Sequence, residues 1–392
     1  MTSGPRVLVT NAQQRKSLAA IRSLGRHGVR VTAAENTCLA MSFYSRYTDQ
    51  AVVYPDPETH PEAFLDWLIS FLRKEPHDVL FSMDDDVLEV VTQHLVELRR
   101  YVIVPVVDRD TYLLASDKLR TVQSAKAAGV RCPKTVSARS LDEVNELAPS
   151  LSFPVVIKPR NSSGSRGLIY VFSQKELLQS WKEVDEIFPQ PLVQEYISPG
   201  GQAIGVSALL DQDSQPYAVF VHRRLREYPV AGGPSALCES IHDQALADLA
   251  VRFLQQLKWF GVAMVEFKTN PNDGLPYLLE INPRFWGSLQ LAIHCGVDFP
   301  WLLYQLAMGN EILPVFHYPA GKRYRWLPGD VLHFLTNRRR WEIAQDFFRI
   351  DMPRTCYEVL SRDDWRPTIG LALTLGGQAL EAAKNSILSA NS

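Results

Sequence analysis

The spacing of apolar positions along the first 115 residues switches back and forth between that of strands and that of helices. Residues 6–10 (RVLVT) predict a buried strand, and residues 13–27 predict a helix that ends at Gly28. The pattern continues with a strand at VRVTAA, a helix near 61–74, a strand at 78–82, a helix near 86–100 and a strand at 101–107. This alternation indicates a doubly wound parallel sheet.

The turn after the first strand has the sequence TNAQQR and lacks the glycine triplet of a dinucleotide-binding site. We therefore do not expect a nicotinamide-binding protein. Residues 116–129 (SDKLRTVQSAKAAG) predict a polar helix capped by Ser or Asp, and the CPKT segment behind it predicts a linker into a second domain.

Short strands in pairs replace this pattern between residues 153 and 282. Turns such as DQDSQ and NPNDG join them, which predicts antiparallel hairpins and an α+β arrangement. The predicted strands are PVVIK with GLIYVF, LVQEYI, AIGVSALL with PYAVFVHRR, and VAMVEFK with PYLLEIN. After residue 297 the chain is mostly helical. The C-terminal segment is basic and rich in aromatic residues. Three roles remain open for it: a subunit contact, a lid over a cleft, or core packing.

The segment LLEINPRFWGS, residues 278–288, follows an apolar strand with a carboxylate, an amide and an arginine. Side chains alternate along a strand, so Glu280 and Asn282 share one face. Pairing with the neighbouring strand would bring Glu266 to the same place. Such an oxygen set suits Mg²⁺, which prefers one or two carboxylates together with phosphate oxygens. Glu266 alone is better explained as a solvent-facing residue, whereas Glu280 and Asn282 followed by Arg284 favour a functional site.

Lys158 ends the strand VVIKP and precedes the loop NSSGSRG at residues 161–167. Backbone N–H groups in such a loop can surround phosphate oxygens, and a fixed lysine adds a positive charge beside them. An ordinary hairpin turn is the alternative. No G-x-x-x-x-G-K-S/T motif occurs, which excludes a Walker-type site. The strand at 192–197 could present backbone amides to an adenine edge, whereas Lys118 taken alone is better explained as a solvated lysine.

Three arginines lie beside a glycine-rich turn in VHRRLREYPVAGGPSALCES. Planar guanidinium groups hold carboxylates through paired hydrogen bonds, so we expect Arg223 and Arg224 to recognise an acid substrate. A solvated charge run explains Arg226 equally well. Asp84 or Asp85 follows a parallel strand and could hold an incoming amine, although a helix N-cap is the commoner use of such acids. We expect His294 to be packed in an apolar helix.

The near balance of 41 Lys and Arg against 43 Asp and Glu gives no electrostatic signature of nucleic-acid or anionic-membrane binding. Five cysteines without a C-x-x-C pair argue against a disulfide framework or a structural zinc site, and fit a reducing cytosol. No stretch approaches the 18 or so apolar residues of a membrane helix. These observations predict a cytoplasmic protein that acts on small molecules.

Together these motifs resemble the ATP-grasp superfamily, in particular its carbamoyl-phosphate-synthetase-like and carboxylate-amine ligase branches, over roughly residues 110–310. The resemblance implies a nucleotide site formed by two lysines, a phosphate lid and an adenine hinge, namely Lys118, Lys158, Ser162, Ser163, Gly164, Ser165, Gly167, Gln194, Glu195, Tyr196 and Ile197. The implied metal ligands are Glu266, Glu280 and Asn282, and Arg284 is implied to steady the transferred phosphoryl group.

One segment departs from the family pattern. The family places an acid just after the hinge to hold the ribose hydroxyls, whereas this chain has PGGQ there. Gln202 could still form a hydrogen bond to the ribose, or Glu195 could take that role.

The resemblance also implies a domain arrangement. We expect a Rossmann-like domain of the kind that precedes ATP-grasp folds at residues 1–115, and a two-lobed ATP-grasp domain at 116–320 with its lid at about 130–197. A helical C-terminal extension is expected at residues 321–392.

The implied activity is that of an ATP-dependent, ADP-forming ligase that activates a carboxylate as an acylphosphate and joins it to an amine, with amino acids or small peptide-like substrates. The implied cofactors are ATP and two Mg²⁺ ions, for which Mn²⁺ can substitute. A kinase or carboxylase on the same nucleotide site, and a non-catalytic nucleotide-binding protein, are the alternatives. Homodimerisation is left open.

Overall fold

The computed structural model describes residues 4–162, 166–230, 232–349, 351 and 354–374. Two compact units are found, each described here by itself. The first comprises the described parts of 1–106, 284–313 and 355–392, and the second those of 107–283 and 314–354. The predicted boundaries at 115/116 and 320/321 stay predictions. No helix in the described part of the chain has the length and apolarity needed to cross a membrane.

The first unit contains a parallel sheet with the strand order β3-β2-β1-β4. Its strands are β1 (Arg6–Val9), β2 (Arg30–Glu35), β3 (Gln50–Val53) and β4 (Val79–Phe81). In the central strand β1, Val7 and Leu8 point to opposite faces and neither is exposed to solvent. A strand buried on both faces is typical of a sheet that helices cover on both sides.

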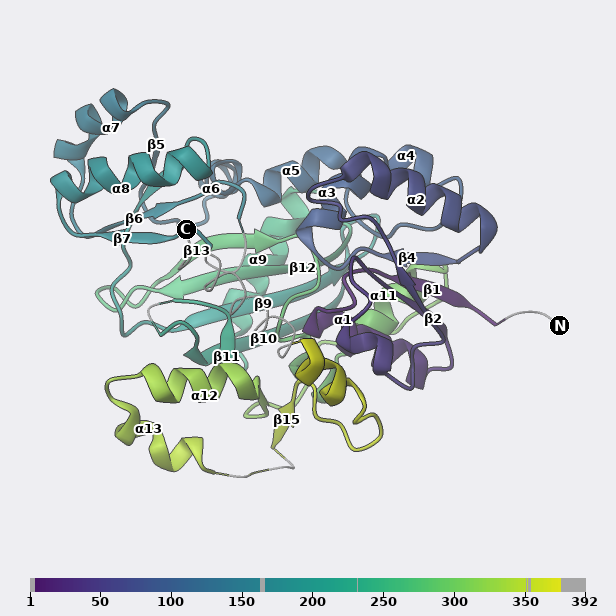
Figure 1. Ribbon diagram of the computed structural model, residues 1–392. Coiled ribbons are helices and arrows are strands. Elements are labelled where there is room, and N and C mark those ends of the chain that lie inside the picture. The colour runs from purple at the N-terminus through teal and green to yellow at the C-terminus, as the bar shows by residue number, and fades with distance from the viewer. Residues whose placement is uncertain (1–3, 163–165, 231, 350, 352–353, 375–392) are drawn as a thin grey trace, which may run out of the picture. The chain divides into compact units, whose positions relative to one another are not determined.

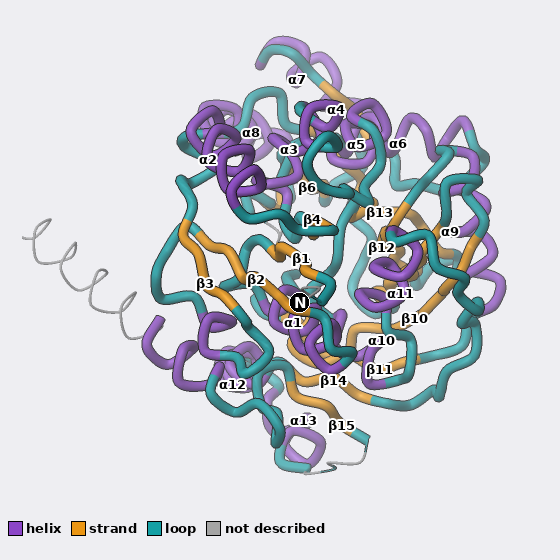
Figure 2. The backbone as a smooth tube through the Cα atoms, turned by 90° about the vertical axis from the view of Figure 1, so that its right-hand side faces the viewer, coloured by secondary structure: helices purple, strands orange, loops and turns teal. Residues whose placement is uncertain are grey.

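Helices do lie on both faces of this sheet (Figure 2). On one face, α2 (Pro61–Lys74), α3 (Asp85–Gln93) and α4 (Leu95–Leu98) share an apolar core with the strands. On the other, α1 (Arg15–Arg26) packs against the short η1 (Met41–Tyr44), α10 (Leu289–His294) and α11 (Phe299–Ala307). The short strand β15 (Thr355–Tyr357) lies against α10.

Most elements predicted for the first unit are confirmed. α1 ends as predicted, because Gly28 takes a φ of +79° directly after the helix. The prediction of a strand at 101–107 is wrong in extent, because the segment forms only a single parallel bridge, between Val79 and Ile103. β3 was missed, because QAVV is four residues long and half-exposed.

The second unit contains a small antiparallel sheet with the order β5-β8-β6-β7. Its strands are β5 (Thr135–Ser137), β6 (Val155–Lys158), β7 (Ile169–Val171) and β8 (Leu192–Glu195). The helices α7 (Leu141–Leu147) and α8 (Gln174–Ile187) cover one face (Figure 1). Trp181 of α8 is buried in this core and donates its indole N–H to the carbonyl of Pro191.

A larger antiparallel sheet forms the rest of the second unit, with the order β13-β12-β9-β10-β11-β14 (Figure 1). Its strands are β9 (Ala203–Leu210), β10 (Pro216–Glu227), β11 (Ser235–Ser240), β12 (Gly261–Thr269), β13 (Pro276–Asn282) and β14 (Arg323–Arg325). The helix α9 (Gln244–Gln256) packs on β9 and β10, and α12 (Leu327–Thr336) packs on β10 and β11. The remaining helices are α5 (Arg109–Ser116), α6 (Lys118–Ala127), η2 (Ala148–Ser150) and α13 (Arg340–Phe347).

The predicted fold class is confirmed. The chain combines a Rossmann-like parallel sheet with two antiparallel lobes, and the described part of the C-terminal extension contains the helices α12 and α13. The antiparallel hairpins that the turns DQDSQ and NPNDG predicted are present as β9–β10 and β12–β13.

Candidate functional site

The predicted metal ligands lie on two paired strands of the larger sheet. In the β12–β13 ladder, Glu266 is the direct partner of Glu280, and Met264 is the partner of Asn282. Paired residues project to the same face of an antiparallel sheet, and so do residues two apart on one strand. Glu266, Glu280 and Asn282 therefore share one face, and the Asn282 amide donates to Oε1 of Glu266 at 3.2 Å.

The turn between these strands sets their register. Gly274 takes a φ of +69°, and its N–H donates to the carbonyl of Asn270 at 2.8 Å. The Asn270 and Asp273 side chains accept from backbone N–H groups of the same turn. Such Asx contacts favour a tight reversal over a continued strand. The local sequence NPNDG thus forms the hairpin, and a register shift between Glu266 and Phe267 then places Glu266 opposite Glu280.

A guanidinium group compensates one of these carboxylates. Arg224 of β10 forms an ion pair with Glu266 and also donates to the carbonyl of Gly233 at 3.2 Å. The strand β9 runs between β10 and β12, and Gly205 lies there in register with Glu266 on one side and His222 on the other. A Cβ at Gly205 would lie 2.5 Å from the His222 ring, so only glycine fits between these side chains.

His222 does not act as a cation at this site. Burial, and then the charge of Arg224, lower the pKa of His222 to about 3. Its imidazole is therefore neutral at physiological pH. We assign it no proton-transfer role.

Lys118 is the first residue of α6, and contacts of its neighbours fix its position. Asp117 caps the helix by accepting from the N–H of Leu119, and it also forms an ion pair with Arg160. The Lys118 N–H donates to the Arg160 carbonyl at 3.1 Å. Its ammonium donates to the Ser162 carbonyl and lies 3.8 Å from Oε2 of Glu280. The structure therefore brings Lys118 to the predicted metal ligands.

Lys158 ends β6 and lies in the same electrostatic environment. Burial lowers its pKa to about 8, while Glu280 opposes and Lys118 adds to this shift. Among the described residues, Lys158 has no hydrogen bond or ion pair. The structure thus provides a cation with a lowered pKa that is available to an anion.

The predicted phosphate lid is described only at its two ends. Ser162 contacts Lys118 through its carbonyl group. Gly167 takes a φ of +75°, and a Cβ there would lie 2.7 Å from both Phe188 and Pro159. Glycine is therefore required at this position. Ser163, Gly164 and Ser165 lie outside the described residues.

The predicted adenine hinge begins in β8 and makes contacts with the small sheet. Gln194 is buried, and its amide donates to Oγ1 of Thr135 at 2.8 Å. The exposed Glu195 accepts from the N–H of Lys134 at 3.1 Å. These contacts anchor β8 to β5, and β8 also pairs with β6, so the first half of the hinge is part of an inner strand of the small sheet.

The second half of the hinge lies against β12. The Lys268 ammonium donates to the carbonyl of Ile197 at 2.9 Å and lies 5.6 Å from the ring centre of Tyr196. Burial lowers the pKa of Lys268. The Gln202 side chain is exposed, and its backbone N–H donates to Oγ1 of Thr269 at 2.6 Å. Lys268 thus links the predicted hinge to the strand that carries Glu266.

Arg284 belongs to the first unit and has its own partners there. Its guanidinium donates to both oxygens of Asp85, at 2.9 and 2.8 Å, and lies 3.1 Å from Asp84. Asp84 also accepts from Lys16 at 3.0 Å. Although burial raises the pKa of Asp84, Lys16 and Arg284 lower it to about 2. The predicted role of Arg284 in catalysis stays a prediction.

The two acids after β4 serve in part as predicted. Asp84 caps α3 by accepting from the N–H of Asp85, which confirms the N-cap expectation. Both carboxylates are also engaged by Arg284, so their proposed use in holding an amine stays a prediction.

The strand register separates Arg223 from Arg224, which we had expected to act together. Neighbouring residues of a strand point to opposite faces, so Arg224 lies on the Glu266 face and Arg223 on the other. There Arg223 pairs with Glu239 at 2.8 Å. For Arg226, acid recognition and a solvated charge had been left equally open; it is buried and pairs with Asp330.

Two further expectations are changed by the structure. His294 is exposed at the end of α10, so the expectation that it packs in the core is wrong. Lys268 and Gly205 were missed. Period-two spacing from Glu266 could have found Lys268. Only the register of three strands shows that Gly205 lies between His222 and Glu266.

No group of three or more His, Cys, Asp or Glu side chains converges as a metal site in the described chain. Glu266 and Glu280 supply two carboxylates, and Asn282 adds an amide oxygen. This small protein ligand set is the kind that Mg²⁺ uses when phosphate oxygens and waters complete its coordination.

Comparison with known proteins agrees with this geometry. A family model described as the ATP-grasp domain matches residues 115–288, a range that includes every predicted site residue from Lys118 to Arg284. Residues 115–288 of this chain form an ATP-grasp domain. The match covers both antiparallel sheets through β13, and hence the strands that carry Lys158, Glu266 and Glu280.

Curated relatives share only part of their length with this ATP-grasp chain. It is 32% identical over 177 residues to D-alanine–D-alanine ligase of Pseudomonas fluorescens, which covers 43% of this chain and 53% of the ligase. It is 26% identical over 210 residues to the carbamoyl phosphate synthase large chain of Pyrococcus furiosus, which covers 50% of this chain and 20% of the synthase. The chain thus spans about half or less of these relatives.

A solved structure shows the likeness of fold. Biotin carboxylase of Campylobacter jejuni, in complex with an ATP analogue, superposes with a TM-score of 0.69 over 82% of this chain and 74% of the carboxylase. The sequence identity is 16%, so this likeness concerns the fold alone.

Proposed function

We propose that this protein is an ADP-forming ligase in which the ATP-grasp domain binds ATP with Mg²⁺ and activates a small carboxylic acid for attack by an amine. The observation that carries the proposal is the convergence of Glu266, Glu280 and Asn282 on the face toward which Lys118 points. The match of residues 115–288 to the ATP-grasp domain and the partial match to D-alanine–D-alanine ligase support it.

The residues fit a magnesium–nucleotide complex. Two carboxylates directly opposite each other repel unless positive charge lies nearby. Arg224 supplies such charge to Glu266 and Lys118 to Glu280, so this face already accepts cations. Bound Mg²⁺ would neutralise the phosphate charge and polarise the phosphoryl group that is transferred.

The lysines fit the phosphates of ATP. Lys158 has a lowered pKa and no ion pair among the described residues, and an anion at its ammonium would offset the cost of burying this charge. Lys118 lies beside it. We propose that both contact phosphate oxygens and that residues 194–197 hold the adenine edge. We also propose that two Mg²⁺ ions bind with ATP and that Mn²⁺ can replace them.

The reaction needs positioning and charge neutralisation rather than a protein nucleophile. A carboxylate oxygen of the substrate attacks the γ-phosphorus of ATP, the bond to the β,γ-bridging oxygen breaks, and ADP leaves. The amine nitrogen then attacks the acyl carbon. The bond between that carbon and the phosphate oxygen breaks, so that phosphate and the amine proton are released.

Residue roles follow from the geometry. Lys118 and Lys158 would stabilise the transferred phosphoryl group, with Arg284 as a further candidate. We propose Arg224 for the acid substrate, because it lies on the Glu266 face. Arg223 is left out of this role, since it projects from the opposite face of β10.

A product assay tests the proposal. The protein is incubated with ATP, Mg²⁺ and pools of small acids and amino acids, while ADP, AMP and free phosphate are followed. We expect ADP and phosphate to form together only when both an acid and an amine are present. Release of AMP would contradict an ADP-forming ligase. A stable phosphorylated product with ADP but no free phosphate would instead identify a kinase.

A further inference from the structure

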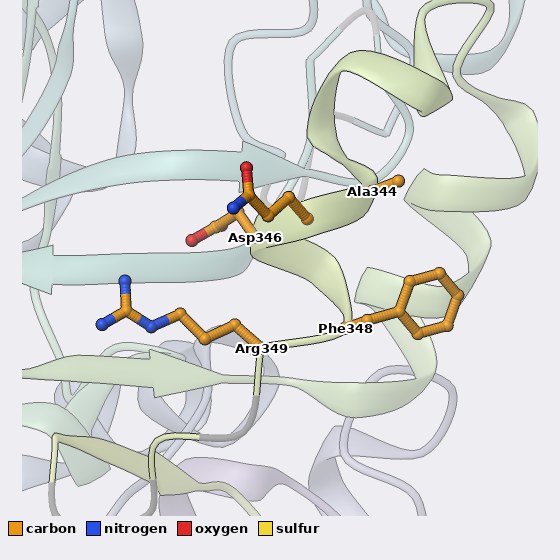
Figure 3. Close-up of a pocket in the computed structure, with 5 residues that line it drawn as sticks. Ala344, Asp346, Phe348 and Arg349 are labelled. Atoms are coloured by element: carbon orange, nitrogen blue, oxygen red, sulfur yellow. The ribbon is translucent and has the colours of Figure 1, made fainter.

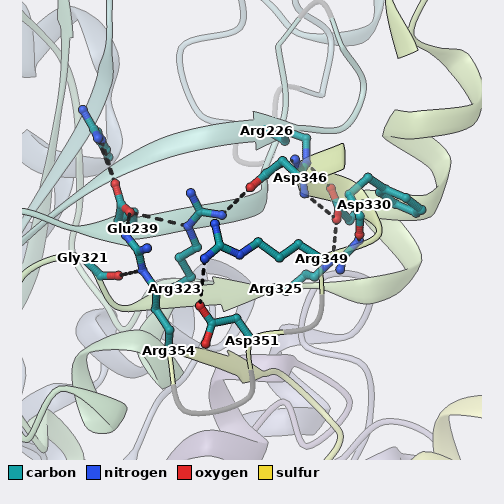
Figure 4. Close-up of polar contacts among 12 residues, drawn as sticks. Arg226, Glu239, Gly321, Arg323, Arg325, Asp330, Asp346, Arg349, Asp351 and Arg354 are labelled. Atoms are coloured by element: carbon teal, nitrogen blue, oxygen red, sulfur yellow. Dashed lines mark hydrogen bonds and ion pairs between the residues drawn. The ribbon is translucent and has the colours of Figure 1, made fainter. Parts of the chain in front are cut away.

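The face of the larger sheet opposite Glu266 carries a row of charged residues. Arg223 of β10, Glu239 of β11 and Arg323 of β14 are direct partners in register, so their side chains lie side by side. A β-bulge in β10 between Arg224 and Arg226 turns Arg226 to this same face. Figure 4 shows Glu239, Arg323 and Arg226 of this row.

Three guanidinium groups converge on the single carboxylate of Glu239. Arg223 contacts Oε2 at 2.8 Å, whereas Arg354 contacts Oε1 at 3.0 Å and Arg323 contacts it at 3.5 Å. Although burial raises the pKa of Glu239, its hydrogen bond and ion pair with Arg223 hold that pKa below its usual range. Glu239 thus remains ionised and holds the three arginines together.

The wider network has more positive than negative charge. Asp346 pairs with both Arg226 and Arg323, and Asp330 pairs with both Arg226 and Arg325. Arg349 lies 3.8 Å from Asp351. The network has six guanidinium groups and four carboxylates, namely Arg223, Arg226, Arg323, Arg325, Arg349 and Arg354 with Glu239, Asp330, Asp346 and Asp351. Two positive charges are therefore in excess.

The excess charge lies where a ligand can reach it. Arg226 and Arg325 are buried beneath α12, whereas the side chains of Arg223 and Arg354 are 36% and 41% exposed. The Nη1 group of Arg223 and that of Arg354 have no acceptor among the described residues. These groups are N–H donors in a fixed arrangement, and such pairs of guanidinium groups match oxyanions.

A cavity adjoins the network. It has a volume of about 730 Å³ and is lined by Asp346 and Arg349 together with Ala344, Gln345 and Phe348 (Figure 3). Asp346 both lines this cavity and pairs with Arg323, so the cavity and the arginine row are neighbours.

We propose that Arg223, Arg323 and Arg354 form a binding site for a doubly charged oxyanion, a phosphoryl group or a dicarboxylate, on the sheet face opposite Glu266. The site is distinct from the nucleotide site, because the two use opposite faces of β10. A divalent anion matches the excess of two positive charges. Glu239 acts as the template that keeps the three guanidinium groups in contact range of one ligand.

The test uses isothermal titration calorimetry of the full chain with inorganic phosphate and, separately, with succinate, at constant ionic strength held by sodium chloride. We expect saturable binding of at least one anion. Tighter binding of phosphate assigns a phosphoryl ligand, and tighter binding of succinate assigns a dicarboxylate. Absence of saturable binding for both anions would overturn the proposal.

Variants locate the binding. Arg354→Gln and, independently, Arg223→Gln should each weaken it about tenfold or more, because each removes a charge-assisted contact. Arg339→Gln, at an exposed arginine paired with Glu342, is the matched control and should bind as the parent does.

Lys158→Gln separates this site from the nucleotide face. Phosphate binding that survives Lys158→Gln but is weakened by Arg354→Gln supports the proposal. Binding that is lost in Lys158→Gln and unaffected by Arg354→Gln would place the anion at the nucleotide face and overturn it. Circular dichroism of each variant checks that it is folded before it is titrated.

Discussion

Glu266 and Glu280 are direct partners across the β12–β13 ladder, with their carboxylates on one face of the sheet. Like charges in this position destabilise a sheet unless cations compensate them. Arg224 and Lys118 lie at the two carboxylates in the described structure. The charges of the paired carboxylates are therefore compensated by cationic side chains of the same unit.

Glu280→Gln is expected to lower the rate of ADP formation at least about a hundredfold, because it removes a carboxylate charge at nearly constant shape. The measurement is the rate of ADP release in the ligase assay, together with circular dichroism to show that the variant is folded. Glu146→Gln, at an exposed glutamate of α7, is the matched control. Full activity in Glu280→Gln would remove this residue from the site.

ATP affinity is expected to fall as the pH rises through about 8, the pKa of Lys158. The ammonium is charged below this pH and neutral above it, and phosphate prefers the charged form. Titration of the protein with Mg²⁺ and ATP between about pH 6.5 and 9.5 measures this dependence. Lys158→Arg should flatten it, because arginine stays protonated throughout. An equally steep fall in that variant would assign the pH dependence to another group.

The contribution of Lys158 to protein stability should rise with pH, whereas its contribution to ATP affinity should fall. The pKa of Lys158 is lowered from 10.5 to about 8 in the folded protein, so the unfolded chain binds the proton more tightly between these values. Its contribution to the free energy of unfolding therefore rises with pH in that window. Denaturant titrations of the parent and Lys158→Met at both ends of the window check this: the rise should be smaller in the variant.

Gly205→Ala is expected to reduce the free energy of unfolding by about 1–3 kcal/mol, because the added Cβ would lie 2.5 Å from the buried His222 ring. Urea denaturation followed by circular dichroism measures the change. Gly4→Ala is the control, since no atom lies within 4 Å of a Cβ placed there. Equal stability of the two variants would show that His222 has room to move.

Asp330→Asn is expected to cost about 3–5 kcal/mol of stability, because it leaves two buried guanidinium groups without their shared carboxylate. Arg226 and Arg325 both pair with Asp330, which has no solvent-exposed surface. Chemical denaturation measures the loss. Glu342→Gln removes the partner of the exposed Arg339 and should change stability by no more than about 0.5 kcal/mol. Similar effects of both changes would show that burial does not strengthen the Asp330 pairs.

Much of the local structure could be predicted from the sequence. The apolar periodicity of residues 13–27 and the position of Gly28 suffice to place α1, because both act within one helix. The turn NPNDG likewise predicts the β12–β13 hairpin, and period two places Glu280 and Asn282 on one face. These features depend on neighbours a few residues apart, and the sequence contains that information directly.

Contacts between distant segments were decided only by the tertiary structure. The sequence shows Arg223 and Arg224 as neighbours, but the register of four strands sends one to Glu239 and the other to Glu266. The partners of Arg226 lie 104 and 120 residues away, and no periodicity indicates them.

The sequence by itself therefore determined most elements of the first unit, the two hairpins and the residue types of the candidate site. The tertiary structure alone decided which charges meet, what lowers the pKa of Lys158 and why Gly205 must lack a side chain. The physical reason is range: backbone propensity and alternation act over a few residues, whereas burial and ion pairing depend on segments that only folding brings together.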